Sequence, residues 1–394
     1  MNIFGFKPRR GAARGGEGFA LAVDTKAHSA RPYSRFAADG SAPLWAAPTR
    51  SYAEQVRSAY ASNPVAQRCC RVVAEAVSGA PLTADVDTVR LLTERAGGQV
   101  LLEAVATHLL LHGNAYVQIV AGAQDRPAEL YALRPDRMTV EMDASGWPVA
   151  YVYKVGGQGR RLPIHDDLGR VSIIHIRTTN PVDDHYGLGC LSAAAQAVAI
   201  HNAAGDWNRA LLANAARPSG ALIYEAGQAG GSLSATQFER LRDEMEAQFQ
   251  GHANAGRPML LEGGLKWQPI SMTPAEMDFH RLKDSAARDI AMAFGVPPML
   301  IGIPGDATYA NYREASKALW RLTVLPMANA ILASIAQGLA SWEMAGRLTV
   351  ALDLVPALSE DRERLWSQVS GADFLSIDEK RAMLGIAPAP EPSS

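Results

Sequence analysis

The sequence predicts an α+β fold, with helices on both sides of one antiparallel β region. Apolar residues recur at helical spacing before residue 112 and again after residue 188. Between residues 115 and 180, short runs of strand character are instead separated by turn signals, as in antiparallel sheets. Because these runs do not alternate with helices, a doubly wound parallel sheet is not expected.

Capping residues predict where the first helices begin and end. Ser51 and Glu54 have the spacing of a capping box, and ordered structure is expected to begin there. Asn63 followed by Pro64 is a second helix start, and Gly79 ends its apolar run. Two more helices are expected at 88–95 and from 100 to about 111, where Gly113-Asn114 breaks the pattern.

The β region is expected to contain five strands. Tight turns between them are indicated by Arg134-Pro135-Asp136, by Asp143 to Gly146 and by Gly156-Gly157. The predicted strands are 115–120, 130–133, 138–142, 149–155 and 171–176.

Two helices are expected to flank a small β-containing insert. The first, 188–216, is dense in small residues, which suits close packing of helices. The second begins at Thr273, with Pro274 at the first helical position and Glu276 completing a capping box, and stops at Gly295. The insert should hold strands at 221–224, 258–261 and 265–270, and a helix that opens on the capping box of Ser234 and Gln237 and closes at Gly251.

The C-terminal third is expected to be mainly helical. After a Gly/Pro-containing loop at 300–308, one helix could run to Trp342 with a kink at Pro326. A strand at 347–354, a helix from Ser359, and a last helix with a capping box at Ser376 and Glu379 that ends at Gly385 should follow.

The charge is unevenly distributed along the chain. The 394 residues carry a formal charge of -2, which argues against a protein that grips nucleic acid over a broad basic face. Residues 1–36, however, hold seven basic and two acidic side chains, a charge of +5 that leaves -7 on the rest. We expect residues 1–40 to be a flexible basic tail, either a solvated leader or a segment that touches nucleic acid or a partner shell.

No membrane segment or disulfide framework is expected. The stretch between Arg321 and Glu343 has no charged residue and is long enough to span a bilayer, but it is punctuated by polar residues. It is interpreted as a weakly amphipathic helix packed between protein surfaces. The three cysteines, Cys69, Cys70 and Cys190, form no paired motif, so a reducing, cytosolic site of assembly is the default.

The best enzyme-like cluster in the sequence contains His175, Asp183, Asp184, His185 and Cys190. These side chains can ligate zinc or transfer protons, so a metal-dependent hydrolase using His175, Asp184 and His185 is an alternative interpretation. They lack the spacing of an HExxH motif, and His108 with His112 is more typical of a packed pair. Without a Walker A pattern or a GxSxG elbow, no catalysis, no metal and no cofactor are expected.

An ordered series of short motifs resembles the portal proteins of tailed bacteriophages, in the branch of long-tailed phages and gene transfer agents. The match covers roughly residues 50–388, and the Ala- and Arg-rich usage resembles a gene transfer agent portal. The motifs are Asn63-Pro64-Val65 through Ala80-Pro81-Leu82, Leu111-His-Gly-Asn-Ala-Tyr-Val117, Leu133-Arg-Pro135 leading into Met138-Thr-Val140, Ile174-His-Ile-Arg177, Tyr186-Gly-Leu-Gly189, Arg217-Pro-Ser-Gly220, Phe294-Gly-Val-Pro-Pro298, Leu325-Pro326 and Phe374-Leu-Ser-Ile-Asp-Glu379.

This resemblance implies a non-catalytic homo-dodecameric ring at one capsid vertex. Double-stranded DNA would pass through its axis, without sequence specificity, during packaging and ejection. The implied partners are the terminase large subunit, a head–tail adaptor and the major capsid protein, and the implied location is a virion or gene transfer agent particle assembled in the bacterial cytoplasm. Another tail or baseplate ring protein is the remaining alternative.

The resemblance also divides the chain into the parts of a portal fold. A wing, two stem helices, a clip, a long kinked tunnel helix and a small helical crown are implied. Their expected ranges are 41–187 (wing, first part), 188–216 (stem helix), 217–271 (clip), 272–299 (stem helix), 300–308 (tunnel loop), 309–355 (wing, second part, with the long helix) and 356–394 (crown and C-terminal tail).

Two sets of site residues follow from that division. The DNA-facing tunnel loop would present Gly302, Ile303, Pro304, Gly305, Asp306, Ala307 and Thr308. The partner-facing candidates of the clip are Phe238, Arg242, Glu246, Arg257, Lys266 and Trp267.

The resemblance changes the meaning of the near-neutral charge. DNA that must slide through a ring would be held back by many tight phosphate contacts. A slightly acidic body with its basic surplus in a tail therefore fits a conduit better than a sequence-reading DNA-binding protein.

Overall fold

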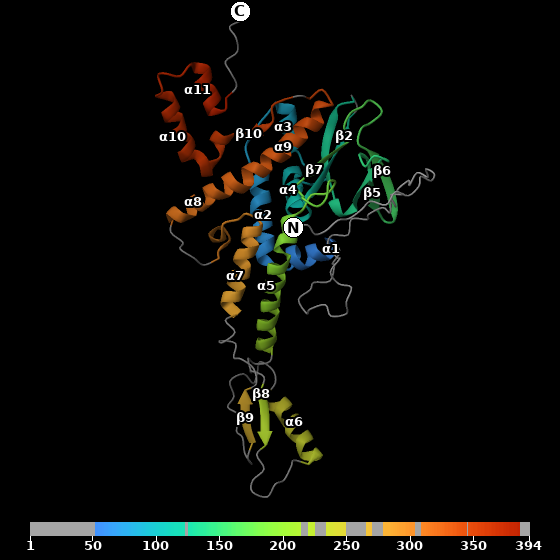
Figure 1. The fold of residues 1–394 in the computed structure, drawn as a ribbon, viewed down its shortest axis with the longest axis vertical. Coiled ribbons are helices and arrows are strands. Elements are labelled where there is room, and N and C mark those ends of the chain that lie inside the picture. The colour runs from blue at the N-terminus through green and yellow to red at the C-terminus, as the bar shows by residue number, and fades with distance from the viewer. Residues whose placement is uncertain are drawn as a thin grey trace, which may run out of the picture. The chain divides into compact units, whose positions relative to one another are not determined.

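Helices α1 to α4 form the first half of the largest hydrophobic core. The computed structural model describes residues 52–122, 125–213, 220–224, 234–249, 265–269, 279–303, 309–344 and 346–386 (Figure 1). The expected basic tail, the Ser51 cap, the strand at 258–261 and the Thr273 cap lie outside these ranges. The first helices are α1 (Tyr52–Gln55), a π-helical turn (Val56–Ala61), α2 (Pro64–Ser78), α3 (Val86–Thr93) and α4 (Leu101–His112).

The caps of these helices follow the sequence closely. The Asn63 side chain accepts hydrogen bonds from the backbone N–H groups of Val65 and Ala66, which starts α2 as predicted. Gly79 is its C-cap, and Gly113 ends α4 in the left-handed conformation at φ 81°. Helix α3 begins earlier than expected because Asp85, not Thr88, is its N-cap.

The predicted β region divides into two three-stranded antiparallel sheets. One has the order β3-β2-β7 and the other the order β4-β5-β6. The strands are β2 (Asn114–Ala121), β3 (Pro127–Leu133), β4 (Met138–Met142), β5 (Pro148–Val155), β6 (Gln158–Pro163) and β7 (Ile173–Arg177). Side chains of both sheets share a second core cluster, in which Tyr116 from the first sheet contacts Tyr151 from the second.

Helices α5 (Cys190–Ala213) and α7 (Phe279–Ala293) pack side by side (Figure 1). Between them in sequence lie β8 (Gly220–Tyr224) and β9 (Leu265–Pro269), paired antiparallel, and α6 (Ala235–Phe249). The capping box of α6 is present, since Ser234 and Gln237 each bond the backbone N–H of the other. Of the predicted elements, the two long helices, the strands at 221–224 and 265–270 and the helix between them are observed, and the strand at 258–261 lies outside the described residues.

The long helix after residue 308 has three parts. These are α8 (Tyr309–Leu319), a π-helical turn (Trp320–Val324) and α9 (Leu325–Ala340). Pro326 lacks an N–H, and the widened turn just before it lets the Leu325 N–H donate to the Trp320 carbonyl. The predicted disturbance at Pro326 is therefore a π turn that precedes the proline.

One side of α9 completes the main core. Ile331, Leu332, Ile335 and Leu339 are at most 1% exposed, and Gly338 lets the side chain of Ile174 on β7 approach the helix. The segment Ala310–Ala340 is long and apolar enough to cross a membrane by length and composition alone. Its apolar side nevertheless packs inside the protein, as expected from the sequence.

The C-terminal part adds a short strand and a pair of helices. The predicted strand at 347–354 is shorter than expected: β10 (Thr349–Val350) pairs with β1 (Leu82–Thr83), and a 3-10 turn (Leu352–Leu354) follows. Helix α10 (Ser359–Ser370) starts at the expected residue. Helix α11 (Ile377–Leu384) has the predicted capping box of Ser376 and Glu379 and ends at Gly385, with φ 78°.

Candidate functional site

Asn114, at the start of β2, connects three segments that carry the sequence motifs. Its side-chain Oδ1 accepts from the Gly187 N–H at 2.8 Å and from His175 Nε2 at 3.0 Å. Its Nδ2 donates to the Gly187 carbonyl at 3.2 Å and to the His112 carbonyl at 3.3 Å. Asn114 is 1% exposed, so these bonds satisfy a buried amide and tie α4, β7 and the segment before α5 together.

Three glycines allow this junction to close. A Cβ on Gly113 would lie 2.5 Å from the Leu188 backbone, and one on Gly187 would lie 2.1 Å from the Gly113 carbonyl oxygen. A Cβ on Gly189 would lie 2.6 Å from the Leu111 carbonyl oxygen. The two motifs around residues 111–117 and 186–189 therefore meet backbone to backbone, and glycine is required there for packing and not for binding a nucleotide.

His175 is a packed core residue and not an accessible catalytic base. Its ring stacks on Tyr116 with centroids 4.3 Å apart and meets the ring of Tyr151 edge-on. Burial, followed by the nearby Arg177 guanidinium, lowers the pKa of His175 to about 3. The imidazole is thus neutral, and its Nε2 carries the proton that is donated to Asn114.

The other members of the enzyme-like cluster do not converge on His175. The Asp184 carbonyl accepts a hydrogen bond from Arg177, and Asp183 Oδ1 accepts from the backbone N–H groups of His185 and Tyr186. Among the residues that the structure describes, no three His, Cys, Asp or Glu side chains are placed to hold a metal ion. No observation on the described residues therefore favours the hydrolase interpretation.

His108 and His112 are a packed pair on α4, as the sequence predicted. Burial lowers the pKa of both to about 4, and each is neutral in the folded chain at neutral pH. His112 meets the ring of Tyr52 edge-on at 4.7 Å. With His175, they form a group of neutral histidines inside the protein.

Only the first part of the predicted tunnel loop lies in the described residues. Gly302 ends the 3-10 turn Pro298–Ile301 with φ 80°, a conformation that favours glycine, and Ile303 follows it. Pro304, Gly305, Asp306, Ala307 and Thr308 lie outside the described residues.

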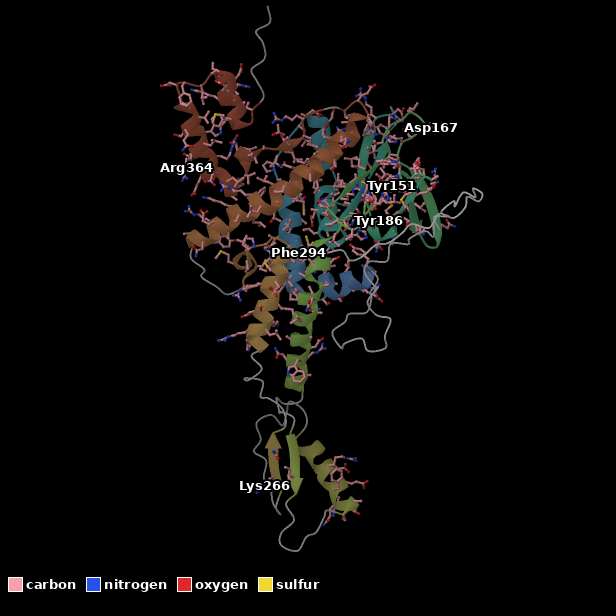
Figure 2. All side chains as sticks on the ribbon, in the orientation of Figure 1. Tyr151, Asp167, Tyr186, Lys266, Phe294 and Arg364 are labelled. Carbon is pink, nitrogen blue, oxygen red and sulfur yellow. The ribbon has the colours of Figure 1, made fainter. Side chains whose placement is uncertain are left out.

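The predicted clip residues are described in part. Phe238 on α6 is 60% exposed, and the neighbouring Arg242 pairs at the surface with Asp243 at 3.3 Å. Lys266 on β9 is exposed (Figure 2). The side chains of Glu246 and Trp267, and the whole of Arg257, lie outside the described part of the chain.

An ionic network joins the helix after the loop to the C-terminal helices. Lys317 Nζ lies 3.0 Å from Glu360 Oε2 and 3.9 Å from Asp361 Oδ1. Arg313 pairs with Glu360, and Arg321 pairs with Asp361, each at 2.5 Å. The three cations recur every four residues along α8 and the π turn, so they form one basic stripe that faces the acidic first turn of α10.

Neither the role of Asn114 nor this ionic network was predicted from the sequence. Asn114 belongs to the motif at 111–117, but the residues that it bonds, His175 and Gly187, are 61 and 73 residues away in sequence. The basic stripe was visible as Arg313, Lys317 and Arg321 at a spacing of four. Nothing in the sequence indicated which acidic residues it would meet.

Comparison with known proteins places these features in a family. The profile described as "Phage portal protein" matches residues 64–385. A protein of Rickettsia felis named only as uncharacterized is 38% identical over 352 residues, which cover 84% of this chain and 88% of the relative.

Two solved structures are also similar over nearly the whole chain. A chain of the virion of a native gene transfer agent particle is 47% identical, with a TM-score of 0.67, and the match covers 89% of this chain and 97% of that one. A chain of the neck of a native gene transfer agent particle, computed with C12 symmetry, is 48% identical, with a TM-score of 0.67 and a coverage of 86% and 94%.

Proposed function

Because this chain belongs to the phage portal protein family, we propose that its copies form the ring at one vertex of a capsid through which DNA is packaged and ejected. Its role is that of a structural portal protein, in a phage or gene transfer agent particle. The observation that carries the proposal is the match over nine-tenths of the chain to a subunit of a gene transfer agent virion. The proposal includes no catalysis by this chain.

The ring is proposed to contain twelve copies, by analogy with the relative whose neck has C12 symmetry. A rotational ring brings two different surfaces of each copy together. The outward side of the π turn and α9 suits such a contact because its exposed residues there are uncharged: Leu322 on the π turn, and Pro326, Asn329, Ala333 and Gln337 on α9. Uncharged helix surfaces can be covered by a neighbour without desolvating ions.

Helices α5 and α7 are proposed to be the stem of the ring. In the described structure α5 turns Leu191, Ala194 and Val198 inward and leaves Ala195, Ala199 and Ala203 exposed. The small exposed residues would allow stems of adjacent copies to approach closely. Residues 217–271 would then be the clip, which is proposed to meet the terminase large subunit first and a head–tail adaptor later.

The charge of the chain supports a conduit for DNA. Outside residues 1–36 the chain carries -7, so the body lacks the surplus of cations that would hold phosphates tightly. The loop 300–308 is proposed to face the DNA, the wing to contact the major capsid protein, and assembly to take place in the bacterial cytoplasm.

Deletion of Ile303 to Asp306 tests the proposed role of the loop. We expect rings to assemble normally while particles package or retain less DNA, because the helices that hold the ring are untouched. DNA content per particle, compared with ring content, is the measurement. If the rings fail to assemble, the loop is a structural element and the assignment is wrong.

The location of the protein separates a portal from another ring protein of the same particle. Gold labelling of an epitope on the chain should mark the junction of head and neck in electron micrographs. A label at the tail tip would instead identify a tail or baseplate protein.

A further inference from the structure

The two sheets of the wing end in three turns that lie close together. The turn after β6 contains Arg170, whose guanidinium lies 2.8 Å from Asp166 and 2.8 Å from Asp125 of the β2–β3 connection. The β4–β5 turn, 143–147, adjoins them because β5 begins beside the end of β6, where the Ile164 N–H donates to the Val149 carbonyl. We name this region the turn end of the wing.

The turn end displays apolar side chains on rigid supports. Asp143 Oδ1 accepts from the N–H groups of Ser145 and Trp147 at 2.8 and 2.9 Å, which closes the β4–β5 turn. Asp166 Oδ1 closes the other turn in the same way, through the N–H groups of Leu168 and Arg170. On these closed turns Trp147 is 72% exposed and Leu168 is 69% exposed.

These two side chains are part of a larger exposed apolar surface. Val120, Met142 and Val149 flank the same turns and are between 37% and 49% exposed. A tryptophan held in place by its backbone loses little conformational freedom on binding, which is typical of residues that anchor protein–protein contacts. A partner that covers this surface is therefore expected.

The two ends of the wing carry opposite charge. At the turn end, Arg170 is directed inward over the ring of Trp342 at 4.1 Å, and the exposed Arg126 is outnumbered by the surrounding carboxylates. Figure 2 shows Asp167 at this outer end, away from the interior pair Tyr151 and Tyr186. The acidic residues of the turn end are Asp125, Glu129, Asp143, Asp166 and Asp167.

The opposite end of the second sheet is basic. The hairpin turn between β5 and β6 and the strand residues beside it, 153–160, contain Lys154 and Arg160 and no carboxylate. Arg161 pairs with Glu141 at 2.9 Å, whereas Lys154 and Arg160 are exposed and have no ion pair among the described residues. We name this region the hairpin end of the wing.

We propose that the turn end of one copy docks against the hairpin end of the next copy around the ring. This inference rests on the proposed function and names a surface and a partner for it. The partner is a second copy of this chain, because the two ends are complementary: one is acidic and apolar, and the other is basic and contains the exposed Val155. The C12 symmetry of the relative's neck fits a contact of this head-to-tail kind.

The charge of each end disfavours one competing arrangement. A two-fold contact centred on the turn end would place carboxylates against carboxylates, and the C12 symmetry of the relative's neck favours a head-to-tail contact over any two-fold one. The eight-residue strand β5 separates the two ends by about 26 Å, which is more than the Debye length of about 8 Å at physiological salt. Each end therefore acts as a separate patch, and only unlike ends attract.

Charge reversal at each end tests the proposal. Glu129→Lys with Asp167→Lys makes the turn end basic, and Lys154→Glu with Arg160→Glu makes the hairpin end acidic; all four side chains are exposed. Each pair should raise the concentration at which half of the full-length chains are in rings by at least about tenfold, measured by mass photometry. The four-site combination restores unlike ends, so it should recover most of the loss.

Two controls separate this contact from folding and from general charge effects. Glu363→Lys, on the exposed side of α10, changes the charge in the same direction as the turn-end pair and should leave assembly unchanged. Trp147→Ser should weaken assembly without changing the charge, and circular dichroism should show that every variant is folded.

The outcomes distinguish this inference from the proposed function. Normal rings from both single-end variants, or a four-site variant that is no better than either, would overturn the docking proposal alone. A wild-type chain that forms no ring at any concentration would overturn the portal function itself.

Discussion

Asn114 is the residue on which the junction of α4, β7 and the segment before α5 depends. The amide oxygen of Asn114 accepts from the Gly187 N–H and from His175, and its nitrogen donates to the Gly187 carbonyl. The glycines around it leave no room for a side chain. The two motifs that meet here, 111–117 and 186–189, are explained by the close packing of their backbones. The quoted Gly187-Leu-Gly189 is a close crossing of two backbones and not a site for phosphate.

Two glycines make the importance of that crossing testable. Gly187→Ala should destabilise the chain by about 3 kcal/mol or more, because its Cβ would meet the Gly113 carbonyl oxygen at 2.1 Å. Gly205→Ala, in the interior of α5 with nothing within 4 Å, should stabilise it by about 0.5 to 1 kcal/mol. Urea unfolding midpoints measure both, and equal midpoints would contradict the account of the junction.

The buried histidines predict a loss of stability in mild acid. The pKa values of His108, His112 and His175 are lowered to about 4, 4 and 3, whereas in the unfolded chain they return to about 6.5. Above pH 6.5 both states are neutral and the histidines add no pH dependence. As the pH falls from 6.5 towards 4, only the unfolded state takes up protons. Each histidine therefore lowers the free energy of unfolding by about 2 kcal/mol at pH 5.

Thermal unfolding at pH 7 and pH 5 checks this prediction. His175→Phe keeps a ring against Tyr116 and should reduce the fall in melting temperature between the two pH values. His165→Gln is the control, since that side chain is exposed and its removal should leave the fall unchanged. A fall of equal size in His175→Phe would show that other groups are responsible.

At the scale of elements, the caps and stops were predictable and the pairing of strands was not. Asn63, Ser234 and Ser376 marked helix starts correctly because capping is decided within four residues. Strand β6 was missed because Gln158 to Arg161 are polar, as suits an exposed edge strand. The division into two sheets depends on contacts such as Tyr116 with Tyr151, which no local pattern encodes.

The candidate site was predictable to a similar extent. The motif series identified the family, whereas composition alone gave only a globular α+β protein. The enzyme-like cluster looked plausible in sequence because burial is invisible there, and partial burial is what lowers the pKa of His175 and keeps its imidazole neutral. The ionic network required the contact between α8 and α10, which are more than forty residues apart in sequence.

The ionic network predicts how α10 and α11 are attached to the long helix. Glu360→Lys with Asp361→Lys would place cations against Arg313, Lys317 and Arg321, and α10 should then open more often. We expect hydrogen exchange in residues 359–370 to rise about threefold to tenfold, as for the loss of a few exposed ion pairs. High salt should produce a smaller change of the same kind in the wild type.

The matched control lies on the same helix. Glu363→Lys reverses one charge in the same direction, at an exposed position that has no ion pair with Arg313, Lys317 or Arg321. Protection of α10 that is insensitive to the double reversal would mean that apolar contacts of Leu358 hold it instead.

At the scale of the whole molecule, the distribution of charge and apolar surface describes one unit of a larger assembly. The chain is near neutral, its described core is well packed, and yet Trp147, Leu168 and the uncharged side of α9 are exposed. A ring covers such surfaces and leaves a slightly acidic body through which DNA can slide. The near-neutral charge and the exposed apolar surface therefore both fit the ring that the chain is proposed to build.

Native mass measurement of the protein taken from particles, combined with electron micrographs of the same sample, tests whether the chain forms a twelve-membered ring. Twelve copies of a 42.1 kDa chain should give a species of about 505 kDa that appears as a ring with a central hole. A stable monomer at every concentration, or an assembly without a central hole, would contradict the account.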